Sequence, residues 1–240
     1  MRPFLLLATR AEDVAADEEY EAFLRFGGLE ESDLERRRLE RDPLGDVDLD
    51  DYAGLILGGS PFTISDDDKS GVQIRVEKEL AALTQEALAR DFPFLGACFG
   101  IGIIGGAVGG TVDTTYREDV GAPTITLTDA GRNDRLFGVM PGEFVAFVGH
   151  KEGVHSLPPD VVILASSPDC PVQGFRVGHN VYATQFHPEL DIEGIKTRID
   201  AYKHFGYFPP EEGDDLKAMA DASGVELPPR LVRRFVELYG

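Results

Sequence analysis

Cysteine is scarce in this chain of 240 residues, which contains only Cys98 and Cys170. Two cysteines are too few for a disulfide-rich secreted scaffold. The N-terminal segment also lacks the long apolar region and the small-residue cleavage site of a signal peptide. We therefore expect a cytoplasmic protein whose thiols stay reduced.

Apolar runs long enough for a lipid bilayer are missing too. The longest stretch without a polar side chain, residues 92–110, is close to the roughly 20 residues that a membrane span needs. Seven of its residues are glycine and one is proline, which disfavours a continuous lipid-facing helix. The stretch is more typical of a glycine-rich core, and we expect no membrane association.

Basic residues are in the minority. The chain has 23 lysines and arginines against 43 acidic residues, a formal net charge of −20. Such a chain repels phosphate backbones and anionic lipid surfaces, so no nucleic-acid partner is expected. The patterns C-x-x-C and H-x-x-x-H do not occur, and the acidic run 66–68 lacks the ligand spacing of a calcium-binding loop. The sequence therefore predicts neither a metal nor a cofactor.

The first half of the chain alternates between two patterns. Residues 4–9, 54–59 and 94–98 are short, continuous apolar runs, whereas residues 14–26 and 72–90 carry apolar side chains at helical spacing. Fully apolar strands that alternate with helices indicate a parallel sheet covered by helices on both faces. We therefore predict an α/β fold with a mostly parallel sheet.

The second half predicts an antiparallel extension of that sheet. Short β-type segments separated by proline and glycine turns occupy residues 124–128, 144–148, 161–165, 173–177 and 181–186. From residue 191 the pattern is helical again, and Leu231, Phe235 and Leu238 predict a last docked helix. We expect one domain over residues 1–190, with a helical extension over 191–240 packed on it.

A candidate nucleophile stands where the third apolar run ends. Residues 96–100 read GACFG, a small-residue strand followed by a tight turn and a glycine-rich helix start. This is the nucleophile-elbow arrangement with cysteine in place of serine. The positive end of the helix favours the thiolate form of Cys98. The alternative is that Cys98 is merely a small buried apolar residue.

The same segment also matches a dinucleotide-binding fingerprint. Gly100, Gly102 and Gly105 spell G-x-G-x-x-G after a strand and at the start of a helix. The match does not lie in the first β-α unit, and glycines at 109 and 110 leave the helix barely two turns. The acidic residue expected further on is also not at a strand end. We keep a non-catalytic dinucleotide-binding or regulatory module as an alternative.

A candidate general base follows the last strand of the second half. Residues 185–189 read QFHPE, which places His187 and Glu189 on either side of a rigid proline. A thiol nucleophile needs a base that takes its proton and returns one to the leaving group, and an acceptor must orient that base. Cys98 and His187 each follow a strand, and strand ends meet at one edge of an open sheet. We predict a Cys98–His187–Glu189 triad.

The two motifs together resemble the class I, triad-type glutamine amidotransferases, closest to the glutaminase domain of GMP synthetase and its stand-alone relatives. The segment LGGSP at residues 57–61 resembles the family's glycine loop. The resemblance implies a flavodoxin-like fold, a γ-glutamyl thioester on Cys98, and an oxyanion hole made by the backbone N–H groups of Gly59 and Phe99. It also implies a substrate pocket, lined by Gly58, Gly100, Gly102, His150, Glu152 and Gln185.

One position departs from the family pattern. Where the family carries glutamine, glutamate or histidine two residues after the second elbow glycine, this sequence has Gly102. The missing side chain is expected to leave space for a substrate larger than free glutamine. His150 and Glu152 fall where relatives carry a histidine and an acidic residue near the site; an exposed loop histidine is the alternative.

The expected function is therefore the glutaminase component of an amidotransferase, which cleaves glutamine or another γ-glutamyl amide. The chain shows no synthetase domain, so a separate synthetase subunit is the expected partner. A stand-alone γ-glutamyl peptide or γ-glutamyl-polyamine hydrolase is the alternative. The sequence indicates neither the ammonia acceptor nor the oligomeric state.

Overall fold

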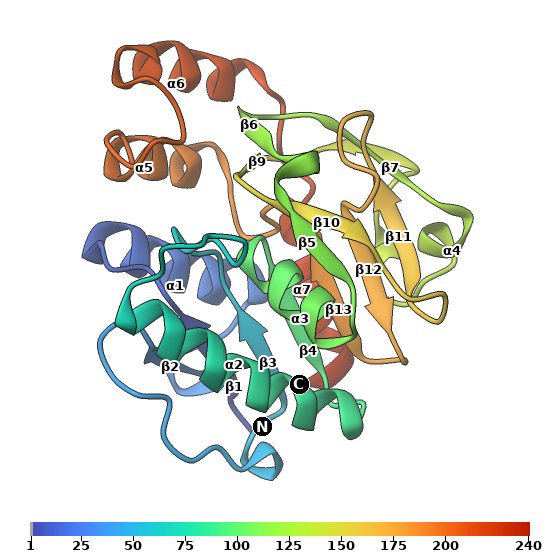
Figure 1. Ribbon diagram of the computed structural model, residues 1–240. Helices are drawn as coiled ribbons and strands as arrows, with labels where there is room; N and C mark the ends of the chain where they lie inside the picture. The colour runs from blue at the N-terminus through green and yellow to red at the C-terminus, as the bar shows by residue number, and fades with distance from the viewer. Residues whose placement is uncertain (1) are drawn as a thin grey trace.

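A large mixed sheet forms the centre of the computed structural model, which describes residues 2–240 (Figure 1). Five neighbouring strands are parallel, in the order β2 (Leu34–Arg38), β1 (Phe4–Ala8), β3 (Gly54–Leu57), β4 (Phe94–Ala97) and β13 (Val181–Thr184). Four antiparallel strands continue the sheet, namely β12 (Gly174–Val177), β11 (Val162–Ser166), β7 (Thr124–Leu127) and β8 (Glu143–Val145). The predicted α/β fold with an antiparallel extension is confirmed.

Helices cover both faces of the parallel half because successive strand side chains point to opposite sides. In β1, Phe4 and Leu6 belong to one buried cluster, and Leu5 and Leu7 belong to another. The first cluster packs against α1 (Asp13–Gly27) and α7 (Pro229–Tyr239). The second packs against α2 (Gly71–Ala89) and α3 (Phe99–Ala107).

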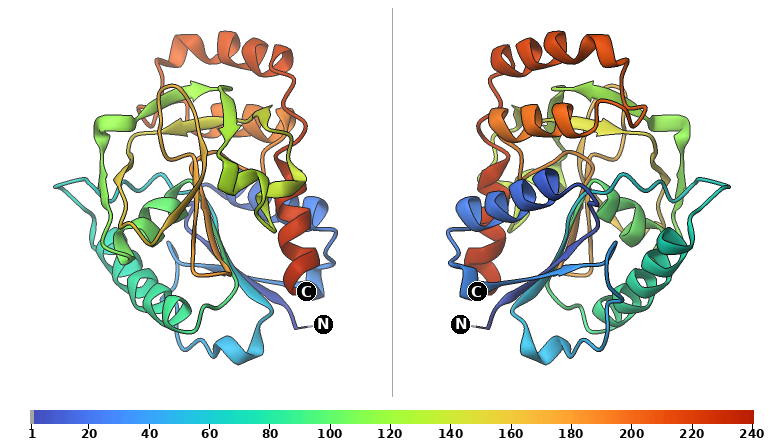
Figure 2. Two further views of the ribbon diagram at one scale, coloured as in Figure 1. Left: turned by 90° about the vertical axis from the view of Figure 1, so that its right-hand side faces the viewer. Right: turned by 90° about the vertical axis from the view of Figure 1, so that its left-hand side faces the viewer.

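Two short ribbons and two further helices lie at the end of the sheet where the site forms. The ribbons pair β5 (Thr111–Asp113) with β10 (Gly153–Ser156), and β6 (Glu118–Gly121) with β9 (Val148–His150). The helices are α5 (Ile192–Ala201) and α6 (Gly213–Ala222), while the small helix α4 (Asp129–Arg132) follows β7. Figure 2 shows α5 and α6 at the end of the molecule opposite the two chain termini.

Several predicted elements differ from the structure. The single strand expected at residues 144–148 is divided between β8 and β9, which belong to different sheets. The strand β2 was not predicted because its sequence, LERRR, lacks an apolar pattern; it lies at the sheet edge, where Arg36 and Arg37 form ion pairs. Edge positions tolerate charge in this way.

The C-terminal segment contacts the rest of the protein at two places. Leu231 and Phe235 of α7 are fully buried in the cluster that includes α1, which confirms the predicted last helix. Ile195 and Ile199 of α5 join a separate buried cluster beside the site. The boundary at residue 190 stays a prediction. Within residues 2–240, no helix combines the length and apolarity needed to cross a membrane.

Candidate active site

Cys98 occupies a sharp turn between β4 and α3. Its backbone angles are φ 52° and ψ −95°, and residues with a side chain rarely adopt such a positive φ. Its N–H donates to the Thr184 carbonyl at the end of β13. A Cβ atom on Gly96 would lie 2.9 Å from the Gly100 carbonyl oxygen, so the turn requires a glycine there. Such strain in a turn that presents one thiol is the geometry predicted for a nucleophile elbow.

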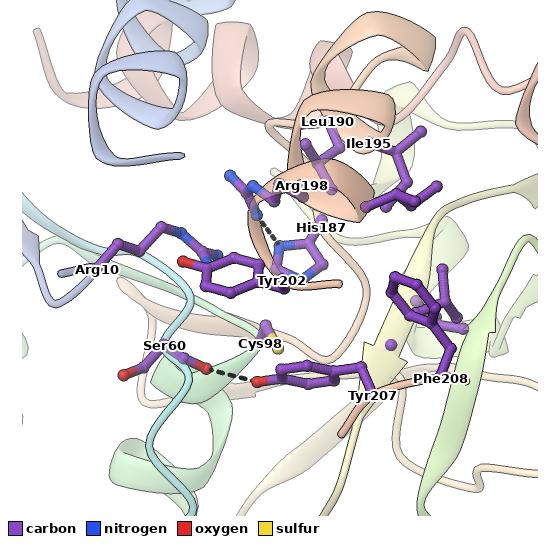
Figure 3. Close-up of a pocket in the computed structure, with 14 residues that line it drawn as sticks. Arg10, Ser60, Cys98, His187, Leu190, Ile195, Arg198, Tyr202, Tyr207 and Phe208 are labelled. Atoms are coloured by element: carbon purple, nitrogen blue, oxygen red, sulfur yellow. Dashed lines mark hydrogen bonds between the residues drawn. The ribbon is translucent and has the colours of Figure 1, made fainter. Parts of the chain in front are cut away.

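His187 and Glu189 lie together beyond the end of β13. His187 lies beside Cys98 in the wall of one cavity (Figure 3). The backbone N–H of His187 donates to the Phe147 carbonyl, which fixes the segment. The ring Nδ1 lies 2.8 Å from Glu189 Oε1, and the ring lines the same cavity as Cys98. Glu189 is fully buried and His187 is 7% exposed, so this chain of contacts is shielded from bulk water.

The electrostatics of this pair favour an imidazolium. Burial opposes the charge on His187, but the Glu189 carboxylate and the Cys98 thiol outweigh it and raise the His187 pKa to about 9. Burial likewise opposes the charge on Glu189, yet His187 and Arg198 hold the pKa of that carboxyl well below its usual range. The arrangement therefore stores a proton on His187 and keeps Glu189 ionised, as a cysteine–histidine pair requires.

A buried group of charged residues behind the triad was not predicted from the sequence. Arg198 of α5 places Nη1 3.0 Å from Glu189 Oε1 and 3.1 Å from His187 Nδ1. Because His187 Nδ1–H also donates to Glu189 Oε1, this one carboxylate oxygen accepts from both His187 and Arg198. Arg10, which follows β1, donates to Glu19 through Nε at 2.9 Å and to the Tyr202 hydroxyl through Nη1 at 3.1 Å. No local motif marks these residues, because helices distant in sequence bring them together.

The glycine loop differs from the expected oxyanion hole in one contact. The Gly59 N–H donates to Glu19 Oε1 at 3.2 Å, so in this structure it does not point freely at a substrate oxygen. Gly59 itself lies against His187, since an added Cβ would come within 2.8 Å of the ring. The Phe99 N–H is the first of α3, where a helix provides no acceptor of its own. The oxyanion role stays a prediction, in which Gly59 must exchange Glu19 for the oxyanion.

Two cavities meet at the nucleophile. Both are lined by Ser60, Cys98, Gly149 and Tyr207. The first, which we call the His187 cavity, measures about 50 Å³ and extends toward His187 and α5. The second, the Gly102 cavity, measures about 20 Å³ and extends along α3. Because a water molecule needs about 10–15 Å³ on this measure, both cavities hold only a few waters.

Four of the predicted pocket residues line the Gly102 cavity, namely Gly102, His150, Glu152 and Gln185. The Gln185 side-chain oxygen is buried without a hydrogen-bond partner in the described part of the chain. An unpaired acceptor of this kind suits a donor group of a substrate, such as an α-ammonium group. Gly58 and Gly100 are not among the residues that line either cavity. They pack instead against Glu19 and Leu57.

The space beside Gly102 is smaller than expected, since the cavity that it lines measures only about 20 Å³. A Cβ atom at Gly102 would lie 2.8 Å from Cδ1 of Ile64, which fills the space. Glu152 holds that loop in place, because its carboxylate accepts the backbone N–H groups of Ile64 and Ser65, each at 2.7 Å. The expectation that Gly102 widens the pocket is therefore wrong for this conformation of the loop.

His150 is buried, contrary to the alternative of an exposed loop histidine. Its Nε2 lies 2.8 Å from Glu118 Oε2, and its Nδ1 lies 2.8 Å from the Glu152 carbonyl oxygen. The ligand atoms of Glu118, His150 and Cys170 all lie within 4.8 Å of one another, a combination that can bind a metal. However, burial raises the Cys170 pKa to about 12, and Gln173 also donates to Glu118. These contacts favour a structural polar cluster.

Comparisons with known proteins agree with this geometry. Residues 31–199 match the family model described as "Glutamine amidotransferase class-I". One subunit of a GMP synthase from Thermoplasma acidophilum is 30% identical over 160 residues, which cover 66% of this chain and 72% of that protein. The gamma-glutamyl peptidase 3 of Arabidopsis thaliana is 29% identical over 182 residues, which cover 73% of this chain and 70% of that protein.

The match to longer relatives is partial. The GMP synthase of Borreliella burgdorferi is 28% identical over 148 residues, but this chain spans only 26% of its length. Among solved structures, a glutamine amidotransferase from Thermotoga maritima superposes with a TM-score of 0.78 over 100% of this chain and 98% of that one. At 19% identity, this last likeness shows the shared fold.

Proposed function

Because this chain belongs to the class I glutamine amidotransferases, an enzyme family, we propose that it cleaves a γ-glutamyl amide through a thioester on Cys98. The observation that carries the proposal is the strained turn that presents the Cys98 thiol to a buried, Glu189-paired His187. A dinucleotide-binding role would use neither the elbow nor the paired histidine.

The groups of the site supply each step. The Cys98 thiolate attacks the side-chain carbonyl, and the Phe99 N–H, the first of α3, is the expected donor to the resulting oxyanion. His187 then gives its proton to the departing nitrogen as the C–N bond breaks, leaving the thioester and a neutral amine. Neutral His187 next takes a proton from water, which attacks the thioester and releases glutamate and the thiolate. Glu189 stabilises the imidazolium in both steps.

Free glutamine, with ammonia as the product that a second protein uses, is the candidate substrate that the GMP synthase relatives support. Two relatives are named as one subunit of a glutamine-hydrolyzing GMP synthase, and a separate synthetase subunit is the corresponding partner for this chain. The second candidate is hydrolysis of a substituted γ-glutamyl amide. It is supported by the relative named gamma-glutamyl peptidase and by the larger of the two cavities, which lies on the His187 side.

Covalent trapping tests the proposal. A diazoketone analogue of glutamine alkylates an activated thiol, and mass spectrometry of peptides locates the adduct. We expect one adduct, on Cys98, in the unchanged chain and in Cys170→Ser, and none in Cys98→Ser. Ammonia release from glutamine should likewise be retained in the unchanged chain and in Cys170→Ser and be lost in Cys98→Ser. Labelling of Cys170, or turnover by Cys98→Ser, would overturn the assignment of the nucleophile.

A further inference from the structure

The two cavities lie on different sides of the reacting carbonyl. His187 lines only the first, whereas Phe99, Gly102 and Gln185 line only the second. His187 must protonate the departing nitrogen, so that nitrogen has to lie within its reach. The γ-glutamyl group then occupies the Gly102 cavity, and whatever is attached to the departing nitrogen enters the His187 cavity.

The walls of the His187 cavity are more apolar than ammonia requires. The wall residues that carry apolar side chains are Val120, Val148, Leu190, Ile195, Ile199 and Phe208. Tyr202 and Tyr207 add two aromatic rings. Ammonia makes no use of such a surface, whereas an apolar substituent on the amide nitrogen would be stabilised by burial there.

The charges at this cavity select the class of substituent. Arg10 and Arg198 line it, and none of the described aspartates and glutamates does, although the chain has 43 acidic residues. Arg198 is engaged by Glu189. Arg10 uses Nε and Nη1 for Glu19 and Tyr202, and its Nη2 has no hydrogen-bond acceptor within residues 2–240. An Arg10 fork with a spare N–H suits a carboxylate, whereas a cationic amine finds no acidic side chain in the wall of the cavity.

The segment of residues 203–212, which we call the strap, contributes Tyr207 and Phe208 to the wall of the cavity. Tyr207 donates its hydroxyl to the Ser60 carbonyl at 3.3 Å (Figure 3). Lys151 donates to the Phe205 carbonyl at 3.0 Å and lies over the Tyr207 ring. Tyr207 also lies against the Tyr202 ring, and Phe208 packs against the buried cluster that contains Ile195 and Ile199. Since the cavity holds only a few waters, part of its wall has to shift to admit a substituent.

We propose that the His187 cavity is a leaving-group subsite for an α-amino acid with an apolar side chain, so that the preferred substrate is a γ-glutamyl dipeptide. The apolar walls and the strap enclose the side chain of the second residue, and Arg10 binds its carboxylate. The inference rests on the proposed thioester chemistry and specifies its substrate.

Steady-state kinetics of the full chain on four substrates test the subsite: glutamine, γ-glutamylphenylalanine, γ-glutamylphenylalanine amide and γ-glutamylputrescine. We expect kcat/KM for γ-glutamylphenylalanine to exceed that for glutamine by at least about tenfold, the range for one well-buried apolar group. Replacing its carboxylate by an amide should lower kcat/KM by about 10- to 100-fold, as expected for loss of a hydrogen bond between charged groups. The cationic putrescine derivative should be the poorest substituted amide.

Three variants test which side chains produce the preference for the dipeptide. Phe208→Ala should lower the ratio of kcat/KM for γ-glutamylphenylalanine to that for glutamine by about 3- to 10-fold, the range for a truncated apolar contact. Ile163→Ala, at a surface position away from the cavity, should leave the ratio unchanged. Arg10→Lys should reduce the discrimination between the carboxylate and the amide; because Arg10 also holds Glu19, its melting curve is recorded alongside.

A failure of the proposed subsite can be distinguished from a failure of the proposed function. If the diazoketone labels Cys98 and glutamine is cleaved at least as well as γ-glutamylphenylalanine, the subsite is wrong and the thioester chemistry stands. If kcat/KM for the amide or for the putrescine derivative equals that for the dipeptide, Arg10 does not recognise a carboxylate and the subsite is also wrong. If Cys98 is neither labelled nor needed for any turnover, the proposed function itself fails.

Discussion

The two sides of Cys98 are built in different ways. The Gly102 cavity is made by turns and strand ends close to the nucleophile, with the Ile64 loop and Glu152 tied together by backbone hydrogen bonds. The His187 cavity adds walls from α5 and the strap, which the C-terminal part of the chain contributes. Apart from the residues that the two cavities share, acyl recognition and leaving-group recognition are therefore carried by different side chains, so that one can change while the other keeps the chemistry.

The two histidines, one on each side, give the largest expected contrast. His187→Ala should lower kcat by at least about 10⁴-fold, because members of a triad act as a unit. His150→Ala should act through structure, because it removes one buried partner of Glu118 and leaves Gln173 as the other. We expect a lower melting temperature with a loss of about tenfold or less in kcat/KM. Single-turnover formation of the thioester distinguishes the two. If thioester formation required His150 and did not require His187, the general acid and base would lie on the opposite side of Cys98 from the one assigned here.

Arg198 tests whether the charges behind the His187 cavity stabilise the protein. Arg198→Met leaves Glu189 and Glu19 buried with one cation fewer, and we expect a loss of about 3–5 kcal/mol in the free energy of unfolding. Arg25→Met is the matched control, since it breaks an exposed pair with Asp191 worth about 0–1 kcal/mol. Urea unfolding measures both. Equal effects would mean that the buried pair contributes no more than the exposed one.

The same contrast explains what the sequence could predict. Cys98, His187 and Glu189 lie in short motifs whose glycines, proline and strand context have local physical reasons, so they could be placed before the structure. Arg10 and Arg198 follow no motif, because only tertiary packing turns them toward the triad. The filled space at Gly102 was missed for a similar reason: Ile64 reaches it from another loop. Strand β2 was missed because an edge strand carries no apolar pattern.

The pH dependence should report the His187–Glu189 pair. With the His187 pKa raised to about 9, kcat/KM should fall above about pH 9 as the imidazolium is lost. The folded pKa exceeds the unfolded value of about 6.5, so the stability that this pair contributes is complete below pH 6.5 and is lost between pH 6.5 and 9.

Glu189→Gln removes the main charge that raises the pKa, so the alkaline limb should move toward lower pH and the melting temperature should change less between pH 6.5 and 9. At pH 8 we expect about 10- to 100-fold lower kcat/KM in this variant. His179→Gln, an exposed position, serves as the control and should retain the profile of the unchanged chain. An alkaline limb that stays at the same pH in Glu189→Gln would show that Glu189 does not set the charge on His187.

The smallest effect is expected at Gly102, on the acyl side. Gly102→Gln introduces a side chain where Ile64 already lies 2.8 Å from the Cβ position, so the single variant should be destabilised by about 1–3 kcal/mol. Adding Ile64→Ala vacates that space, and the double variant should recover most of the stability. It should also improve kcat/KM for glutamine by up to about tenfold, because the new amide can contact the γ-glutamyl group. The preference for a dipeptide over its amide should not change, because Arg10 and the His187 cavity are untouched. Thermal melting of the two single variants and the double variant measures the coupling energy between the positions.

Two outcomes would contradict this picture. If the double variant is no more stable than Gly102→Gln alone, Ile64 is not what excludes a side chain at this position. If the double variant also loses its preference for the dipeptide over the dipeptide amide, the two sides of Cys98 are not independent.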